Sequence, residues 1–420
     1  MAWQTSKTGR LERLIVFLGN EARPVGELSF QGGGRIRTSL FRYARSWLED
    51  MNGRRPLYPI ELPLRARAKD STPYELPLPI YDASPDGWGR MVLEVAFPNQ
   101  VFGMGEFLAA AGDNRSGELR FGHDPIIGPE VWIPGPTEIT MPDGTETIED
   151  LAVAAEAVDS GKATGHHLSL LLRASADTGG ARPKAHLRHE GGDWIAKFKS
   201  WGDGFDNPRM EAVCLSLAEE CGIETPPHQF TEIAGRSILL IHRFDRIDGG
   251  SRLGYMSAAS LAKVPPSTYT TDWTYADVAA AARSAGIVPC EAELFRRMLF
   301  NCLIHNTDDH LRNHAFVRDD AGWRLSPVVD VVPNKNPTLV LRPSRGSDAT
   351  VDINVAFDAW PKFLLEKEQA QTIRDEIETG MRKLPELLDK YEVSSKDRET
   401  VSEQVPDIKR STVYGMLGSR

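Results

Sequence analysis

Nine consecutive residues, 305–313, hold the side chains of this chain that are best suited to chemistry. The segment reads HNTDDHLRN and contains two histidines, two aspartates and an arginine. Within it Asp308 precedes Asn313 by five positions, and Asp330 follows at the end of RLSPVVD. A carboxylate and a neutral amide at the D-x-x-x-x-N spacing, followed by a second carboxylate, form the layout of a phosphoryl-transfer site.

The chemistry of phosphoryl transfer explains these residue types. The transferred group spreads negative charge over its oxygens, so oxygen ligands must hold Mg²⁺ while one carboxylate orients the attacking hydroxyl. By spacing Asp308 is the base, and Asn313 and Asp330 are the metal ligands. Asp309 remains an alternative to Asp308 as the base, because only the sequence spacing to Asn313 distinguishes the two aspartates. Valines flank Asp330, which predicts a buried carboxylate that needs a partner or a metal.

The parts that a nucleotide requires come earlier in the chain, in the expected order. The stretch 175–185, SADTGGARPKA, offers a glycine pair whose backbone amides can approach phosphates. A lysine follows between apolar neighbours in WIAKF, and fourteen residues later a glutamate on a helix can pair with it. Backbone groups at the end of ILLIHRF would face an adenine. The expected nucleotide-binding residues are Gly179, Gly180, Ala181, Lys184, Lys197, Glu211, His242, Arg243 and Phe244.

Each feature also has a plain structural interpretation. Adjacent glycines usually form an ordinary turn, and Asn and Asp are common in loops that follow a helix. A zinc or nuclease cluster of His305, His310 and His314 with the aspartates is a further alternative, although its ligands lack a regular spacing. We expect His310 instead to orient Asp308 or a loop carbonyl, and we place it with the catalytic residues Asp308 and Lys197.

Hydrophobic periodicity predicts the elements that position these residues. Residues 11–121 favour short strands and turns, and a loop-heavy stretch places a soft domain boundary near 125–148. Asn207 and Pro208 are the expected N-cap and first residue of a helix that Gly222 ends. Further predictions are helices at 84–97, 149–161, 291–306 and 367–391 (a pair), strands within 182–200 and 236–244, and a hairpin at 314–333.

Composition limits the function classes. A chain of 420 residues with 41% hydrophobic content forms a large core, while a net charge of −10 disfavours direct contact with DNA. The four cysteines lie in apolar helical patterns without paired spacing, which predicts core thiols in a reducing cytoplasm. The first apolar run has only about five residues and no run reaches about eighteen, so neither secretion nor membrane insertion is expected.

Several motifs together resemble the HipA family, bacterial serine/threonine kinases of type II toxin–antitoxin systems. The matching stretches are GGARPKA, IAKF, RFDR at 243–246, NTDDHLRN and LSPVVDVVP, and SPDGWGR at 84–90 resembles the signature of the family's N-terminal subdomain. The similarity extends over about 14–385.

This resemblance implies an α+β, two-lobed protein-kinase-like fold. It implies a β-rich N-terminal subdomain at 1–148, a mixed β N-terminal lobe with the nucleotide-binding core at 149–245, and an all-α C-terminal lobe at 246–420. Lys197 would bind ATP phosphates, Asp308 would be the base, and Asn313 and Asp330 would ligate Mg²⁺. The expected substrate is a bacterial protein, one known type being an aminoacyl-tRNA synthetase. The expected partner is a HipB-like helix-turn-helix antitoxin, through which alone the chain would reach DNA.

The chain departs from the family at Asp177. Many relatives carry there a serine whose autophosphorylation ejects the loop from the nucleotide site. A carboxylate mimics part of the charge of phosphoserine or abolishes this control. Our hypothesis is that self-inactivation is weakened or moved to Ser175 or Thr178, and intact-mass measurement after incubation with Mg-ATP tests it.

Two other functions stay open from the sequence. A small-molecule kinase of the aminoglycoside or choline type also uses a D-x-x-x-x-N loop, and it would have an acidic pocket in its C-terminal lobe. A non-catalytic nucleotide-binding corepressor of an antitoxin–DNA complex would lose the chemistry of Lys197 or Asp308, and both side chains are present here.

Overall fold

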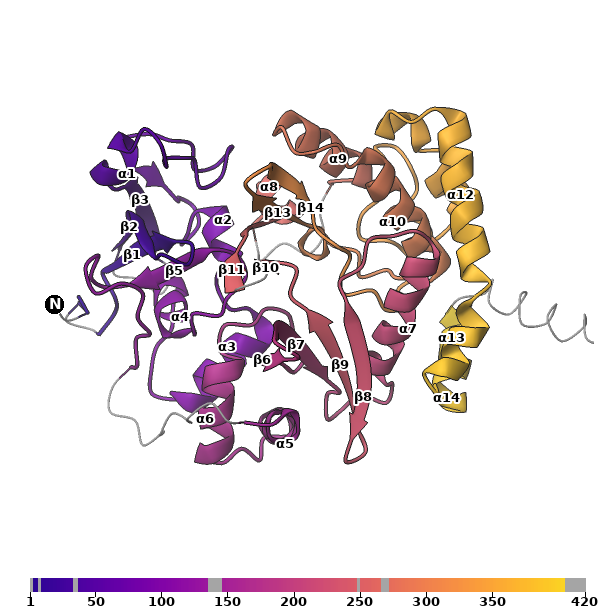
Figure 1. Ribbon diagram of the computed structural model, residues 1–420, viewed down its shortest axis with the longest axis horizontal. Coiled ribbons are helices and arrows are strands. Elements are labelled where there is room, and N and C mark those ends of the chain that lie inside the picture. The colour runs from indigo at the N-terminus through magenta and orange to yellow at the C-terminus, as the bar shows by residue number, and fades with distance from the viewer. Residues whose placement is uncertain are drawn as a thin grey trace, which may run out of the picture. The chain divides into compact units, whose positions relative to one another are not determined.

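A computed structural model describes residues 3–6, 9–32, 37–134, 146–247, 250–265 and 272–404 of the chain (Figure 1). The contacts within the chain divide it into two compact units. Unit 1 comprises Met1–Gly202, Ile233–Arg236 and Asp245–Met256, and unit 2 comprises Asp203–Glu232, Ser237–Phe244 and Ser257–Arg420. Residues 135–145 of the soft boundary predicted near 125–148 lie outside the described ranges.

Unit 1 begins with an antiparallel sheet in the strand order β4-β3-β2-β1-β5. Every residue of β1 after Arg13 is buried, as expected for a strand that has neighbours on both edges and cover on both faces. Four helices interrupt this region, so the strands and turns predicted for 11–121 describe it only in part. The bounds are β1 Arg13–Leu18, β2 Arg23–Gln31, β3 Thr38–Tyr43, β4 Lys69–Asp70, β5 Leu119–Gly122, α1 Arg45–Glu49, α2 Leu78–Tyr81, α3 Gly87–Ala96 and α4 Met104–Ala110.

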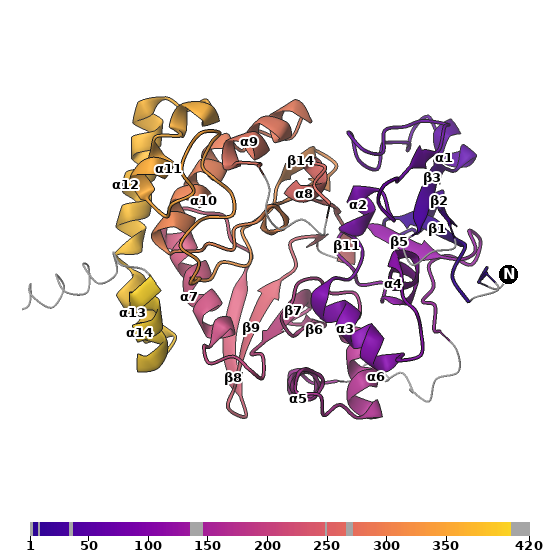
Figure 2. The ribbon, with the colours of Figure 1, turned by 180° about the vertical axis from the view of Figure 1, so that it is seen from behind.

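The second part of unit 1 is a hairpin, β6 (Lys184–His189) and β7 (Gly192–Phe198), that packs against α5 (Ile148–Asp159) and α6 (Gly165–Ala174). Figure 2 shows these two helices beside the hairpin. Threonine side chains cap both helices, which fixes where they begin. The predicted helix at 149–161 and the two strands in 182–200 are confirmed. The segment that returns to unit 1 carries β10 (Arg246–Ile247) and β11 (Ser251–Arg252), and β12 (Gly254–Ser257) follows.

Unit 2 is largely helical. Its long helix α10 packs against α9, α11 and α12, and α7 packs against α12 and α13. The N-cap of α7 is Asp206, whose carboxylate accepts the N–H of Arg209, so the prediction of Asn207 as the cap is wrong by one residue. The bounds are α7 Asn207–Glu220, β8 His228–Ile233, β9 Arg236–His242, α8 Ala258–Leu261, α9 Tyr275–Ser284, α10 Glu291–Leu303, β13 Ala315–Asp319, β14 Gly322–Leu325, α11 Ile353–Phe357, α12 Lys367–Met381, α13 Leu384–Lys390 and α14 Ser395–Gln404.

The four cysteines are buried and free, as predicted for core thiols. Burial raises the pKa of the Cys221 and Cys290 thiols to about 12, so these groups stay protonated and unreactive at neutral pH. None of the helices in the described ranges combines the length and apolar character that crossing a membrane requires.

Candidate active site

The loop after α10 separates its two adjacent aspartates. His305 adopts a left-handed φ of 58° and turns the chain out of the helix. Asp308 then projects into solvent, with 62% of its side chain exposed, whereas Asp309 is buried. Only Asp308 is therefore accessible to the hydroxyl of a substrate, which favours it as the base over its neighbour.

Asn313 is tied to the same loop. It ends a short 3₁₀ turn, Leu311–Asn313, and its side-chain Nδ2 donates to the backbone oxygen of Asp308 at 2.7 Å. This bond uses one of the two N–H donors of the amide and leaves its oxygen as the group that can ligate a cation. The bond ties the Asn313 side chain to the backbone of Asp308.

Asp330 is exposed, and the prediction that its carboxylate is buried is wrong. Its φ of 55° is left-handed, which is uncommon for a residue other than glycine, while Val328 and Val331 on either side are buried. The unusual backbone therefore turns the carboxylate outward from an apolar segment. Such conformations persist where the surroundings enforce them, and they concentrate at functional sites.

Glu211 provides part of that enforcement. It is buried on α7, and its Oε1 accepts the backbone N–H of Asp330 at 3.1 Å. This contact joins residues 119 positions apart, and no sequence pattern indicated it. The expected pairing of Glu211 with Lys197 joins the two units and stays a prediction.

His310 lies near the carboxylates of Asp308 and Asp330. Burial lowers the pKa of its imidazole, while the nearby negative charges of Asp308 and Asp330 oppose that shift. Its Nε2 lies 3.9 Å from Asp308 Oδ1, too far for a hydrogen bond but close enough for electrostatic attraction. We refer to Asp308, His310, Asn313 and Asp330 as the acidic cluster.

The other two histidines are held elsewhere in unit 2. His305 Nδ1 contacts the backbone oxygen of Asn334 at 2.8 Å. His314 is buried against the edge of Tyr275, and burial lowers its pKa to about 3, so it is neutral. Among the residues that the structure describes, no group of three or more His, Cys, Asp or Glu side chains is placed to hold a metal ion.

The end of β9 carries the residues expected near an adenine. His242 ends the strand, and its N–H donates to the oxygen of Pro227 at 2.8 Å, so this amide is not available to a base. Arg243 follows as a buried side chain and Phe244 is half-buried. The expectation that backbone groups of His242, Arg243 and Phe244 face an adenine stays a prediction.

The glycine-rich loop of unit 1 connects α6 to β6, and its tip is exposed. Gly179, Gly180 and Ala181 form this tip, and Gly180 has a left-handed φ of 75°. Within the described ranges, the amides of these three residues donate no hydrogen bond. Consecutive backbone amides without acceptors form a concave site that attracts anions.

Two lysines stand beside this tip. Lys184 and Lys197 lie directly opposite each other in the register of β6 and β7, so their side chains share one face of the hairpin. The Lys184 Nζ is so near the loop that a Cβ atom at Gly180 would lie 2.6 Å from it. Like charges directly opposite each other on adjacent strands repel each other. We call Lys184 and Lys197 the lysine pair.

The hydroxyls considered for autophosphorylation lie inside unit 1. Ser175 and Thr178 are both buried. The Ser175 Oγ donates to the oxygen of Lys184 at 2.7 Å, and the Thr178 Oγ1 donates to the oxygen of Ser175 at 2.8 Å. Phosphorylation of either hydroxyl therefore requires the loop to leave this conformation.

Asp309 gives the loop a pH-dependent stability. Burial raises the pKa of its carboxyl to about 7, and the hydrogen bonds that it accepts, among them that of Val340 N–H, oppose this only in part. Its folded-state pKa exceeds the value of about 3.9 in an unfolded chain, so its contribution to stability decreases as the pH rises through 7. The variant Asp309→Asn should therefore be more stable than the wild type above pH 7. This difference in stability should shrink as the pH falls from 7 toward about 5.

Denaturant unfolding of both proteins across this pH range measures the effect. His314 is present in both proteins, so its effect on stability cancels from the difference. The exposed Asp320, changed to Asn, is the matched control and should show no such trend. A gain of the same size at every pH would contradict the assignment.

Comparisons with known proteins agree with this architecture. Residues 176–384 match the family model described as the HipA-like C-terminal domain. A chain of the solved complex of the Shewanella oneidensis MR-1 toxin–antitoxin system, with HipA, HipB and operator DNA, superposes with a TM-score of 0.62 at 16% identity. The superposition covers 95% of this chain and 96% of that one.

A curated relative gives a shorter match. The protein of Sinorhizobium fredii (strain NBRC 101917 / NGR234) named "Putative kinase Y4mE" is 26% identical over 171 residues. The similarity spans 37% of this chain and 40% of that relative. The chain thus carries a HipA-like C-terminal domain. The predicted α+β class and kinase-like fold are confirmed.

Proposed function

We propose that the chain is an ATP- and Mg²⁺-dependent serine/threonine protein kinase that acts as the toxin of a type II toxin–antitoxin module. The acidic cluster is the observation that carries this proposal. It combines an exposed carboxylate, a fixed amide oxygen and a second exposed carboxylate, with His310 near both carboxylates. This is the set of groups that a phosphoryl-transfer enzyme needs in order to orient a hydroxyl and hold a metal.

The residues present fit Mg²⁺. This ion is usually held by one or two protein oxygens and completes its shell with waters and substrate phosphates. The amide oxygen of Asn313 and the carboxylate of Asp330 are two such ligands, and the backbone of the second is fixed by Glu211. When bound, the ion would neutralise charge on the phosphates. Asp308 would accept the proton of the substrate hydroxyl.

The glycine-rich loop and the lysine pair fit a nucleotide triphosphate. The amides of Gly179, Gly180 and Ala181 would donate to phosphate oxygens, and Lys184 and Lys197 would supply positive charge on the adjoining face. We assign the contact with the adenine to the backbone of Arg243 and Phe244.

The partner that we propose is a HipB-like helix-turn-helix antitoxin. The structurally similar chain was solved together with HipB and operator DNA. This chain carries a net charge of −10, which favours an indirect route to DNA through such a partner. The substrate that we propose is a bacterial protein, with an aminoacyl-tRNA synthetase as the first candidate to test, and its phosphorylation would arrest growth.

Label transfer in a cell lysate tests the proposed function. The protein is incubated with γ-³²P-labelled ATP and Mg²⁺, and the variant Asp308→Asn is the inactive control. We expect transfer to a discrete protein band that only the wild type produces. Transfer to small molecules alone would indicate the aminoglycoside-kinase class. Label transfer that does not depend on Asp308, or none at all, would indicate a non-catalytic corepressor and overturn the proposal.

A further inference from the structure

The segment SPDGWGR, residues 84–90, lies against the glycine-rich loop in unit 1. The N–H of Asp86 donates to the oxygen of Thr178 at 3.2 Å, and the N–H of Trp88 donates to the oxygen of Gly180 at 2.8 Å. The Trp88 side chain is fully buried, and its Nε1–H donates to the oxygen of Lys184 at 3.0 Å. One short segment at the start of α3 thus contacts the loop at Thr178 and Gly180 and the first residue of β6, Lys184.

The packing between the two segments leaves no room for a side chain at Gly89. A Cβ atom at Gly89 would lie 2.5 Å from the oxygen of Thr178, closer than real Cβ atoms come to such a neighbour, and 3.0 Å from the oxygen of Ala176. Gly87 is equally close, since its Cβ would lie 2.6 Å from the oxygen of Gly180. The glycines of the motif are therefore explained by close approach to the loop backbone.

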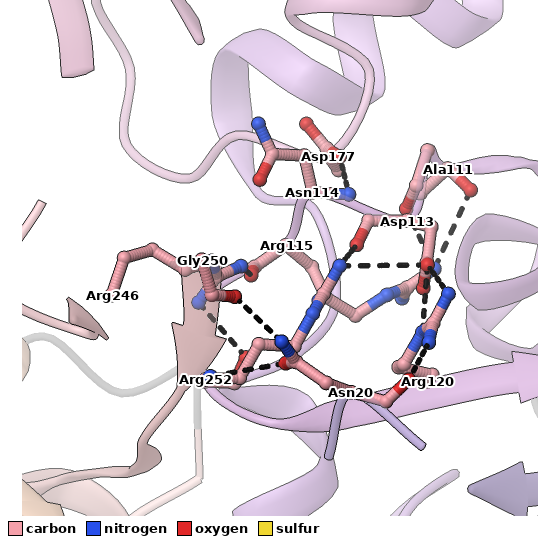
Figure 3. A network of polar contacts seen from close by, with 12 residues as sticks. Asn20, Ala111, Asp113, Asn114, Arg115, Arg120, Asp177, Arg246, Gly250 and Arg252 are labelled. Carbon is pink, nitrogen blue, oxygen red and sulfur yellow. Dashed lines mark hydrogen bonds and ion pairs between the residues drawn. The ribbon is translucent and has the colours of Figure 1, made fainter. Parts of the chain in front are cut away.

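Asp177 anchors the loop at a second point. Its carboxylate is fully buried, accepts the N–H of Asn114 at 2.6 Å and pairs with His186 Nδ1 at 3.0 Å. Figure 3 shows Asp177 beside Asn114, next to the polar network that holds this part of the chain. In that network Arg115 donates to the backbone oxygens of Ala83, Leu108 and Gly112, and Arg246 donates to the oxygen of Arg115 at 2.8 Å. The anchor itself is therefore fixed.

These contacts determine the direction of the loop amides. In a trans peptide the carbonyl and the next N–H point in opposite directions. Because the oxygens of Thr178 and Gly180 point to the segment 84–90, the N–H groups of Gly179 and Ala181 point away from it. Within the described ranges these two N–H groups have no hydrogen-bond acceptor. The segment thereby presents an ordered pair of donors to solvent.

We propose that residues 84–90, together with Asn114, form a cradle that positions the glycine-rich loop for nucleotide phosphates. The inference rests on the proposed function, because it assigns these phosphates to the loop. The cradle residues do not touch the nucleotide. They act through the orientation of the Gly179 and Ala181 amides, so their loss should weaken nucleotide binding more than it slows transfer once the nucleotide is bound.

The variant Gly89→Ala tests the cradle, and Gly165→Ala is its matched control. Gly165 is likewise in the first turn of a helix of unit 1, but no atom lies within 4 Å of the position of its Cβ. We expect Gly89→Ala to weaken binding of Mg²⁺ with a non-hydrolysable ATP analogue about tenfold or more, equivalent to about 1.4 kcal/mol. The KM for ATP should rise by a similar factor while kcat at saturation changes less than about threefold. The control should match the wild type in both.

A second variant guards against simple misfolding. Trp88→Phe removes only the indole donor to Lys184 and should weaken binding in the same direction, with an unchanged Asp308-dependent kcat. Hydrogen exchange at the amides of Asp86 and Trp88, which should quicken in Gly89→Ala, reports the cradle without any nucleotide. If the wild type binds nucleotide and Gly89→Ala and Trp88→Phe bind it equally well, the cradle is wrong and the proposed function stands. If the wild type itself binds no nucleotide, the proposed function fails and the cradle assignment fails with it.

Discussion

Replacing Asp308 by Asn should lower kcat for phosphoryl transfer by about 10²- to 10⁴-fold, the usual contribution of a general base. The amide has the size of the carboxylate but cannot accept a proton from the substrate hydroxyl. Binding of Mg-ATP should change by less than about threefold, because Asp308 is not among the groups assigned to the metal or the phosphates. Steady-state transfer to the labelled protein band, with calorimetric titration of Mg²⁺ and the ATP analogue, measures both quantities.

Two neighbouring carboxylates provide the controls for this result. Asp320 is exposed in the turn between β13 and β14, and Asp320→Asn should retain full activity. Asp309→Asn separates the two adjacent aspartates, because it removes a buried charge without removing the exposed carboxylate. If Asp309→Asn lost more activity than Asp308→Asn, the assignment of the base would be reversed.

The sequence predicted most elements around the site because their local signals are strong. The helix at 149–161, the strands in 182–200 and the helix pair at 367–391 all appear where hydrophobic periodicity and capping residues indicated them. The spacing of Asp308 and Asn313 also reflects a local contact, because the side-chain amide of Asn313 donates a hydrogen bond to the backbone oxygen of Asp308. Such features depend on residues that are close in the chain.

The errors arise where the backbone departs from regular geometry. Asp330 between valines predicted burial, because in an extended segment apolar neighbours indicate a buried environment. A left-handed φ at that residue reverses the direction of its side chain, and nothing in the amino-acid type of Asp330 requires that conformation. The N-cap of α7 moved from Asn207 to Asp206 for a smaller reason, since both side chains can cap a helix.

Long-range contacts account for what sequence reasoning missed entirely. The bond from the N–H of Asp330 to Glu211 and the contacts of Trp88 with the glycine-rich loop join residues about a hundred positions apart. The sequence predicted that Glu211 pairs with a lysine and gave no indication of its contact with Asp330. The segment SPDGWGR resembled a family signature, but the sequence assigned it no structural role. Its two glycines and its tryptophan were the available signal, because close backbone approach and a buried indole donor both require a partner.

Replacing Lys197 by Met should weaken binding of Mg-ATP by about 10- to 100-fold, since hydrogen bonds to charged groups contribute about 1.5–3 kcal/mol. The same change should alter the stability of the nucleotide-free protein by less than about 1 kcal/mol, because it also removes a like charge opposite Lys184. Calorimetric titration measures the first effect and denaturant unfolding without nucleotide measures the second. A large loss of affinity with little loss of stability would mark the lysine pair as a binding feature.

The lysine just beyond the same strand is the matched control. Lys199 is exposed after the end of β7, and Lys199→Met makes the same change of net charge outside the lysine pair. It should leave ATP affinity within about twofold of the wild type, because its exposed charge lies outside the lysine pair. Equal losses in the two variants would mean that overall charge, and not the lysine pair, governs binding. The double variant Lys184→Met with Lys197→Met removes both positive charges that the proposed phosphates would contact. The two losses should therefore not be additive, as expected for residues that share one ligand.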